Sequence, residues 1–148
     1  TPASVAPVFD MFRPAINAQL PTLLDHAALA LRHPRQRSLF QIASATMAGF
    51  RGTLTQFGFT EIQTPKLVSS ATESGANVFE IDYFGKQAYL AQSPQFYKQM
   101  MVGVFERVFE VGPVFRAEPH ATVRHVNEYV SLDVEDLRRA VAHLDHEP

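Results

Sequence analysis

The sequence predicts one mixed α/β domain built on an antiparallel sheet, with a long helix packed beside it. Apolar residues recur at three-to-four spacing over residues 35–57, which predicts an amphipathic helix. Two strand-like runs, residues 107–118 and 128–135, flank a polar loop and predict a hairpin near the centre of the sheet. A chain of 148 residues is the size of one domain and is long enough to bury a sizeable core.

The composition is that of a globular protein. Hydrophobic residues make up 46% and charged residues 19% of the chain, so nothing indicates disorder. The formal net charge of -2 gives no overall basic field, so any contact with RNA has to be local. The absence of cysteine excludes disulfides, thiolate catalysis and thiolate metal sites. Because no apolar run is long enough for a membrane span, a cytoplasmic protein is expected.

The N-terminal part is expected to lead into the long helix. Residues 1–21 form a predicted leader or hinge remnant, because their prolines forbid a long helix there. Residues 23–31 are apolar and rich in alanine, which predicts a short helix. Pro34 is tolerated in a first helical turn and marks the start of the long helix, and Gly58 marks its end.

The next stretch alternates short elements with turn signals. Residues 59–63 predict a strand, followed by Pro65, a residue tolerated at a sheet edge. Residues 78–84 and 87–91, joined by Gly85 and Lys86, predict a second hairpin.

A helix is expected from Pro94 to about residue 104, with Ser93 as its N-cap. Lys98 lies three residues beyond Gln95, about one helical turn, so both side chains can reach one ligand. A lysine is what a pocket for a carboxylate needs, although an exposed lysine on a helix is the common alternative.

The hairpin over residues 107–135 carries unusual polarity. Period-two geometry puts Arg116 and Glu118 on one face of its first strand, and the loop carries Arg124 and His125. A guanidinium fork suits phosphate oxygens, and a glutamate can accept a hydrogen bond from an amino group. On the residues alone, a solvated hairpin with ordinary surface ion pairs explains the pattern equally well.

Several separate strings resemble a known family. The strand VFRAE, a loop containing RH and a return strand ending LDVE resemble motif 2 of the class II aminoacyl-tRNA synthetases, in its aspartyl form. The long helix, the GF pair, the following strand and Pro65 resemble motif 1, which forms the dimer interface in that family. The resemblance covers residues 22–135, the expected catalytic core, and implies the synthetase fold: an antiparallel sheet flanked by helices, here truncated.

The resemblance implies that the chain binds aspartate. QSPQFYK is similar to the aspartyl family's substrate segment, in which the positions of Gln95 and Lys98 hold the amino acid. Glu73 matches a glutamate that binds the substrate ammonium group. Arg116 matches the catalytic arginine, which grips the substrate carboxylate and the α-phosphate.

The resemblance also implies an ATP site on the same hairpin. Besides Arg116, the family pattern has Glu118 accepting from the adenine amino group, while Arg124 and His125 steady the β- and γ-phosphates. Tyr129 is placed to stack on the adenine face. The family reaction is carboxylate attack on the α-phosphate of ATP, followed by transfer of the aminoacyl group to tRNA.

The resemblance stops after Glu135. No Gly-rich, Arg-bearing motif 3 follows, and the acidic ligands for the Mg²⁺ that the family uses are absent, so little or no aminoacylation is expected from this polypeptide alone. Residues 136–148 predict a short amphipathic tail helix, in which His143 and His146 are expected to be solvated and to hold no metal.

Three interpretations follow from these patterns. The first is the catalytic core of an aspartyl-tRNA synthetase, a homodimer through the long helix and Pro65 that binds aspartate, ATP and tRNA. The second is a shortened, non-catalytic paralog that acts as a dimeric binding or regulatory module. The third is a relative that activates aspartate without tRNA.

Overall fold

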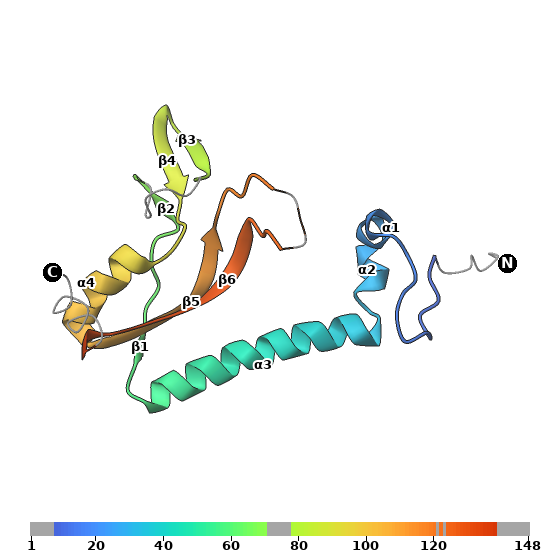
Figure 1. Cartoon of the computed structure of the whole chain (residues 1–148), viewed down its shortest axis with the longest axis horizontal. Coiled ribbons are helices and arrows are strands. Elements are labelled where there is room, and N and C mark those ends of the chain that lie inside the picture. The colour runs from blue at the N-terminus through green and yellow to red at the C-terminus, as the bar shows by residue number, and fades with distance from the viewer. Residues whose placement is uncertain (1–7, 71–77, 121, 123, 139–148) are drawn as a thin grey trace. The chain divides into compact units, whose positions relative to one another are not determined.

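The structure is a computed structural model that describes residues 8–70, 78–120, 122 and 124–138. Contacts between residues divide the chain into two compact units, residues 1–48 and 49–148. Figure 1 labels the helices and strands in chain order. None of the helices in the described ranges has the length and apolar character that a membrane span requires.

In the described part of the first unit, two short helices precede the long helix, where one was predicted over residues 23–31. Helix α1 is Leu20–Asp25, with Pro21 in its first turn, and α2 is Ala27–Ala30. His26 separates them because its backbone angles, φ −116° and ψ 33°, are not helical. The alanine-rich composition predicted helix correctly, but it carried no signal for this break.

Helix α3 spans Pro34–Gln56, close to the predicted range of 35–57. His33 organises its first turn: Nε2 donates to the carbonyl of Arg13 at 2.8 Å, and Nδ1 accepts from the amide of Arg35 at 3.2 Å. The His33 residue is buried, with 3% exposure. An imidazole nitrogen therefore satisfies one of the amides that a helix start leaves unpaired, as a serine or aspartate oxygen usually does.

The end of α3 is where Gly58 predicts it. Gly58 has φ 78°, a left-handed conformation that glycine adopts without a steric penalty. Its amide donates to the carbonyl of Thr55 at 3.0 Å, and the amide of Phe59 donates to the carbonyl of Leu54 at 3.0 Å. This pair of bonds is a Schellman motif, which satisfies carbonyls of the last turn and fixes where the helix stops.

Among the described residues of the second unit, the strands form two three-stranded sheets. In the first, β5 (Arg107–Phe115) lies between β1 (Thr60–Glu61) and β6 (Glu128–Asp136). Strands β5 and β6 are antiparallel, with Arg107 opposite Asp136, so the predicted hairpin is confirmed (Figure 1). Strand β1 is parallel to β5. The long pair of this sheet is therefore antiparallel and its short pair is parallel.

The second sheet has the order β2 (Leu67–Val68), β4 (Lys86–Leu90), β3 (Glu80–Tyr83) and is antiparallel throughout. Its β3–β4 hairpin is confirmed, but the turn consists of Phe84 and Gly85, with φ values of 52° and 77°, and not of Gly85 and Lys86 as predicted, because Lys86 pairs with Tyr83. Two consecutive residues with positive φ give the type I′ turn, whose twist matches that of the strands. Strand β2 was not predicted, because two residues are too few to show a periodic pattern.

Two predicted strands are shorter than expected. Of residues 59–63, only Thr60–Glu61 pair as a strand. Strand β5 ends at Phe115 and not at residue 118, because the amide of Glu118 donates to the carbonyl of Arg116 at 2.8 Å. A bond between residues two apart is a tight turn. The period-two argument that put Arg116 and Glu118 on one strand face is therefore wrong beyond the end of β5.

Helix α4, Gln95–Phe105, contacts β5 and β6 and closes the core of the second unit. Val102 of this helix packs with Ile62 and with Val108 of β5, which is fully buried. On β5, the buried ring of Phe109 receives the edge of the Phe50 ring from α3, at 5.8 Å between centroids. The predicted tail helix lies outside the described residues except for its first positions.

Candidate functional site

Lys98, predicted to bind a carboxylate, is buried. Its ammonium nitrogen lies 3.1 Å from Oδ1 of Asp133 and 3.7 Å from Oε2 of Glu135, and its side chain is only 5% exposed. Lys98 is therefore not an exposed helix lysine, which was the common alternative. An ammonium group has three N–H donors, so this one keeps the capacity to bind a further acceptor.

Asp133 and Glu135 were given no role by the sequence analysis. They lie on β6 with Ser131, and all three are partly buried, whereas Val130 and Val134 are exposed. The Ser131 hydroxyl donates to the carboxylate of Asp133. Polar residues at every second position of an otherwise apolar strand were the signal that could have found them. Together they place two negative charges beside the single positive charge of Lys98.

Gln95 is the first residue of α4 and is half-buried. The helix begins one residue later than predicted, and its N-cap is Pro94 and not Ser93. The Ser93 hydroxyl still accepts from the amide of Gln95, at 3.4 Å. That Gln95 and Lys98 hold one ligand stays a prediction.

Arg116 follows β5 at the loop end of the β5–β6 hairpin. Its amide donates to the carbonyl of Asn127 at 2.9 Å, and the amide of Glu118 donates to the side-chain oxygen of Asn127 at 3.1 Å. Arg116 and Glu118 are both half-buried. Asn127 thus fixes the backbone that carries both predicted ligands, and its position at the end of a polar loop was the signal for that role.

The loop after Glu118 presents Arg124 and His125 to solvent. Thr122 organises it: the Thr122 hydroxyl accepts from the amide of Arg124 at 3.3 Å and lies 2.7 Å from Nδ1 of His125. The ring of His120 meets the ring of His125 edge-on, at 5.5 Å between centroids. The described residues of this loop therefore present a guanidinium and imidazoles to solvent, where an anion could reach them.

The predicted ATP residues lie at one end of the hairpin. Tyr129 is opposite Val114 in the β5–β6 register and is 39% exposed. It lies two residues beyond Asn127, which bonds to Arg116. The backbone of the hairpin therefore brings the arginine and the tyrosine to the same end.

Lys98 contacts the β5–β6 hairpin nearer its middle than the end that carries Arg116 and Tyr129. Its partner Asp133 is opposite Glu110, six residues before Arg116, which is about 20 Å along a strand. Glu73, the third residue expected to share one hollow with Lys98 and Arg116, lies outside the described residues. The convergence of these groups on one ligand stays a prediction.

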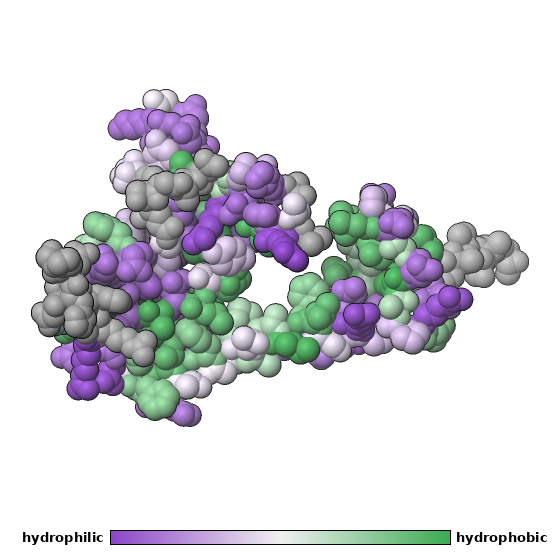
Figure 2. Space-filling model, in the orientation of Figure 1, coloured by the Kyte–Doolittle hydropathy of each residue, from purple (hydrophilic) through white to green (hydrophobic). Residues whose placement is uncertain are grey.

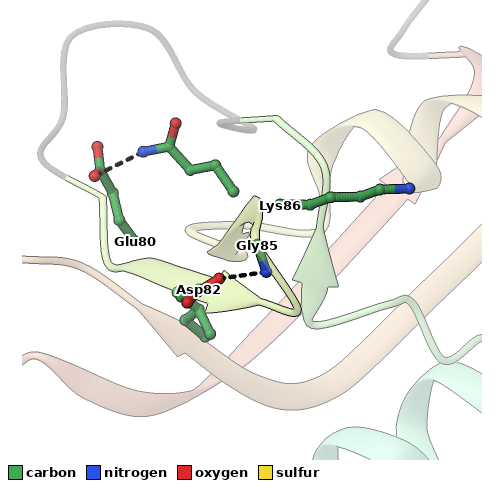
Figure 3. A pocket seen from close by; sticks show the side chains of 6 residues that line it. Glu80, Asp82, Gly85 and Lys86 are labelled. Carbon is green, nitrogen blue, oxygen red and sulfur yellow. Dashed lines mark hydrogen bonds between the residues drawn. The ribbon is translucent and has the colours of Figure 1, made fainter.

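A cavity of about 290 Å³ occurs in the β3–β4 hairpin, and none of the predicted site residues that the structure describes lines it. It is lined by Glu80, Ile81, Asp82, Gly85, Lys86 and Gln87. Within it the amide of Gly85 donates to Asp82 at 2.8 Å, and the amide group of Gln87 donates to Glu80 at 2.8 Å (Figure 3). These polar groups form hydrogen bonds with one another within the hairpin, so the cavity gives no indication of a ligand site.

Comparison with known proteins identifies the family. The family described as tRNA synthetases class II (D, K and N) matches residues 19–139, which is most of the chain. The chain belongs to the class II tRNA synthetases. This confirms the family that the two motifs of the sequence indicated.

Several curated relatives of this synthetase chain are named Aspartate--tRNA(Asp/Asn) ligase. An Aspartate--tRNA(Asp/Asn) ligase of Deinococcus radiodurans is 57% identical over 119 residues, which are 80% of this chain and 27% of the relative. The ligase of the same name from Thermus thermophilus is 55% identical over 114 residues, 77% of this chain and 27% of the relative. The chain thus spans about a quarter of the length of these relatives.

Solved synthetase structures share the fold. An asparaginyl-tRNA synthetase from Pyrococcus horikoshii, complexed with asparaginyl-adenylate, matches 80% of this chain and 27% of its own with a TM-score of 0.76 and 35% identity. A putative aspartyl-tRNA synthetase from Leishmania major Friedlin matches 84% of this chain and 24% of its own, with a TM-score of 0.74 and 41% identity. The predicted class II synthetase-like fold is confirmed.

The synthetase resemblance implies a magnesium ion, and such an ion needs ligands from the protein. Among the described residues, no group of three or more acidic or histidine side chains is placed to hold a metal ion. The two carboxylates that lie together, Asp133 and Glu135, are engaged with Lys98. The residues described here thus show no preformed metal cluster, and no chemical step below is routed through one.

Proposed function

We propose that this chain forms the aspartate- and ATP-binding part of a cytoplasmic aspartate–tRNA ligase. The observation that carries the proposal is the buried ammonium of Lys98, 3.1 Å from Asp133 and 3.7 Å from Glu135. Burying a lysine has a desolvation cost that must be offset by charged or hydrogen-bonding partners, whereas an exposed lysine on a helix has no such cost. The names of the relatives, Aspartate--tRNA(Asp/Asn) ligase, supply the substrate class.

Lys98 gives the proposed site its preference for aspartate. The ammonium group is held in place by Asp133 and Glu135 and binds the side-chain carboxylate of the substrate with its remaining donor capacity. Asparagine offers a neutral amide at the same place, and a buried cation favours the charged partner. In this proposal Gln95, from the same helix, also holds the amino acid, and Glu73 binds its ammonium group.

The reaction proposed is formation of aspartyl-adenylate. A carboxylate oxygen of aspartate attacks the α-phosphorus of ATP, the bond to the β-phosphate breaks, and pyrophosphate leaves. Arg116 binds the α-phosphate and the substrate carboxylate, because a guanidinium fork neutralises charge that develops there. Glu118 accepts from the adenine amino group and Tyr129 stacks on the ring, while Arg124 and His125 steady the outer phosphates. The aspartyl group then passes to tRNA.

Ligand binding and pyrophosphate exchange test this proposal. We expect aspartate to bind more tightly than asparagine, and Lys98→Met to abolish that preference. Aspartate-dependent exchange between ATP and pyrophosphate measures adenylate formation, and charging of added tRNA separates a ligase from a tRNA-independent aspartate-activating relative. A chain that binds aspartate and asparagine equally and shows no exchange at any protein concentration would contradict the proposal.

We further propose that the chain forms a homodimer through α3 and Pro65. None of the residues of α3 is buried, and Leu39, Phe40 and Ile42 are 55%, 62% and 63% exposed. Figure 2 shows hydrophobic residues along this helix. Pro65 is exposed as well, beside a cavity of about 310 Å³ lined largely by apolar side chains of α4 and residues 60–65. An apolar surface of this kind on a helix calls for a partner.

The mass of the chain in solution tests the dimer. We expect sedimentation equilibrium to give a dimer of the unmodified chain. We expect Ile42→Glu to give a monomer, because the substitution places a charge among the exposed apolar side chains of α3. The control Ser44→Glu adds the same charge at an exposed polar position of α3 and should leave the dimer intact. A stable dimer without pyrophosphate exchange would favour the second interpretation, a dimeric binding or regulatory module.

A further inference from the structure

Glu110, near the middle of β5, is a buried carboxylate that none of the predicted functions uses. The residue is 1% exposed. Its two oxygens accept three hydrogen bonds: from the amide of Thr64 at 3.0 Å, from the hydroxyl of Thr64 at 2.7 Å, and from the ammonium of Lys66 at 2.8 Å. Both partners lie more than 40 residues earlier in the chain, so this carboxylate joins two distant segments.

The three side chains form a closed cluster. The ammonium of Lys66 also donates to the hydroxyl oxygen of Thr64 at 3.0 Å, while that hydroxyl donates its own proton to Glu110. The cluster packs against Gly112, which has no side chain. A Cβ at this position would lie 3.3 Å from Oε1 of Glu110 and 3.5 Å from Nζ of Lys66, so a larger residue would crowd the cluster. Hydrogen bonds around a buried carboxylate restrict the geometry of such a cluster, because a shift leaves the buried charge of Glu110 without its partners.

The backbone of Lys66 continues the connection into the candidate site. Its carbonyl accepts from the amide of Ala91 at 2.9 Å, and the carbonyl of Ala91 accepts from the amide of Phe115 at 3.0 Å. Ala91 begins the segment that leads to Lys98, and Phe115 is the residue before Arg116. The path therefore starts on β5 at Glu110, passes through Lys66 and Ala91, and returns to β5 beside the predicted ATP arginine.

We infer that Glu110 and Lys66 are positioning residues that set the register between residues 91–98 and the strand that carries Arg116. Their ion pair fixes Lys66, and the backbone of Lys66 then fixes Ala91 against Phe115. An apolar pair could fill the same space without a desolvation cost, so a buried ion pair here serves geometry more than stability. The inference rests on the proposed function, which makes these two segments the aspartate and ATP sides of one site.

Amide hydrogen exchange tests the positioning without any ligand. The variant is Glu110→Gln, which keeps the shape and removes the charge. The matched control is Glu61→Gln, which makes the same change in the exposed ion pair between Arg51 and Glu61, 2.9 Å apart. We expect Glu110→Gln to speed exchange of the Ala91 and Phe115 amides about tenfold relative to the rest of the unit, because their ordering is local.

The reference amide is that of Val102 in α4, which is buried but lies outside the proposed path. If Glu110 serves overall stability alone, exchange at Val102 should rise as much as exchange at Ala91 and Phe115. That result, or unchanged exchange at both amides, would overturn the inference. Thr64→Val removes the two side-chain hydrogen bonds of the Thr64 hydroxyl, one to Glu110 and one from Lys66, and no charge. It is the milder variant if Glu110→Gln does not fold, and it should give the same selective pattern with a smaller change.

Binding of a non-hydrolysable ATP analogue, with and without aspartate, tests the consequence for the site. We expect aspartate to strengthen binding of the analogue to the unmodified chain, and Glu110→Gln to remove most of this coupling while Glu61→Gln keeps it. A Glu110→Gln chain with full coupling would refute the positioning role. If the unmodified chain binds neither ligand, the proposed function fails, and the exchange measurement still decides whether the ion pair orders the two segments.

Discussion

Replacing Lys98 by methionine is the sharpest test of the candidate site. Methionine fills a similar volume but has no charge, so the change isolates the ammonium group. In the structure this group holds Asp133 at 3.1 Å and Glu135 at 3.7 Å. Without it, two carboxylates of like charge stay together on β6 in a partly buried place.

The expected loss of stability follows from burial. Removing one partner of a fully buried ion pair costs about 3–5 kcal/mol, because it leaves an uncompensated charge. The side chains of Asp133 and Glu135 are 23% and 18% exposed, so water offsets part of the loss. We therefore expect Lys98→Met to lower the free energy of unfolding by about 2–3 kcal/mol. Adding Asp133→Asn should recover about 1 kcal/mol, since it removes one of the two stranded charges.

Urea unfolding measures both variants, and the slope of the transition shows whether the folded state is unchanged. The control is Lys86→Met, the same substitution at an exposed lysine of β4, which should stay within about 0.5 kcal/mol of the unmodified chain. If Lys98→Met is no more destabilising than Lys86→Met, the ammonium is not held as the structure has it. The reasoning about the aspartate site would then fail with it.

Four further substitutions have defined outcomes. Gly112→Ala presses a methyl group on Glu110 at 3.3 Å and should cost about 1–2 kcal/mol in urea unfolding, whereas Gly103→Ala, with open space in α4, should stabilise by up to about 1 kcal/mol. Gly58→Ala should cost about 1 kcal/mol, because φ 78° strains any residue with a Cβ; an unchanged thermal midpoint would contradict the Schellman ending of α3. Arg116→Lys should weaken binding of an ATP analogue at least about tenfold by calorimetry, since a point charge cannot replace a bidentate fork, and equal affinity would argue against phosphate binding by Arg116.

Features set by local stereochemistry could be predicted from the sequence. The period of apolar residues gave α3 to within one residue at each end, and Gly58 marked its stop because only glycine reaches φ 78° without strain. The β3–β4 and β5–β6 hairpins were found from turn residues between strand-like runs. The motif strings also gave the family, because they record residue types in a fixed order.

The tertiary structure decided which side chains meet. The partners of Lys98 lie 35 residues or more away on β6, and those of Glu110 lie 44 and 46 residues away beside β1. Such contacts depend on the register of β5 with β6 and on the parallel pairing of β1, which no local pattern contains. The sequence by itself thus determined the long helix α3, the two hairpins and the family. Only the folded chain selected the carboxylate partners of Lys98 and Lys66, because long-range pairing is fixed by packing and by the cost of leaving a buried charge alone.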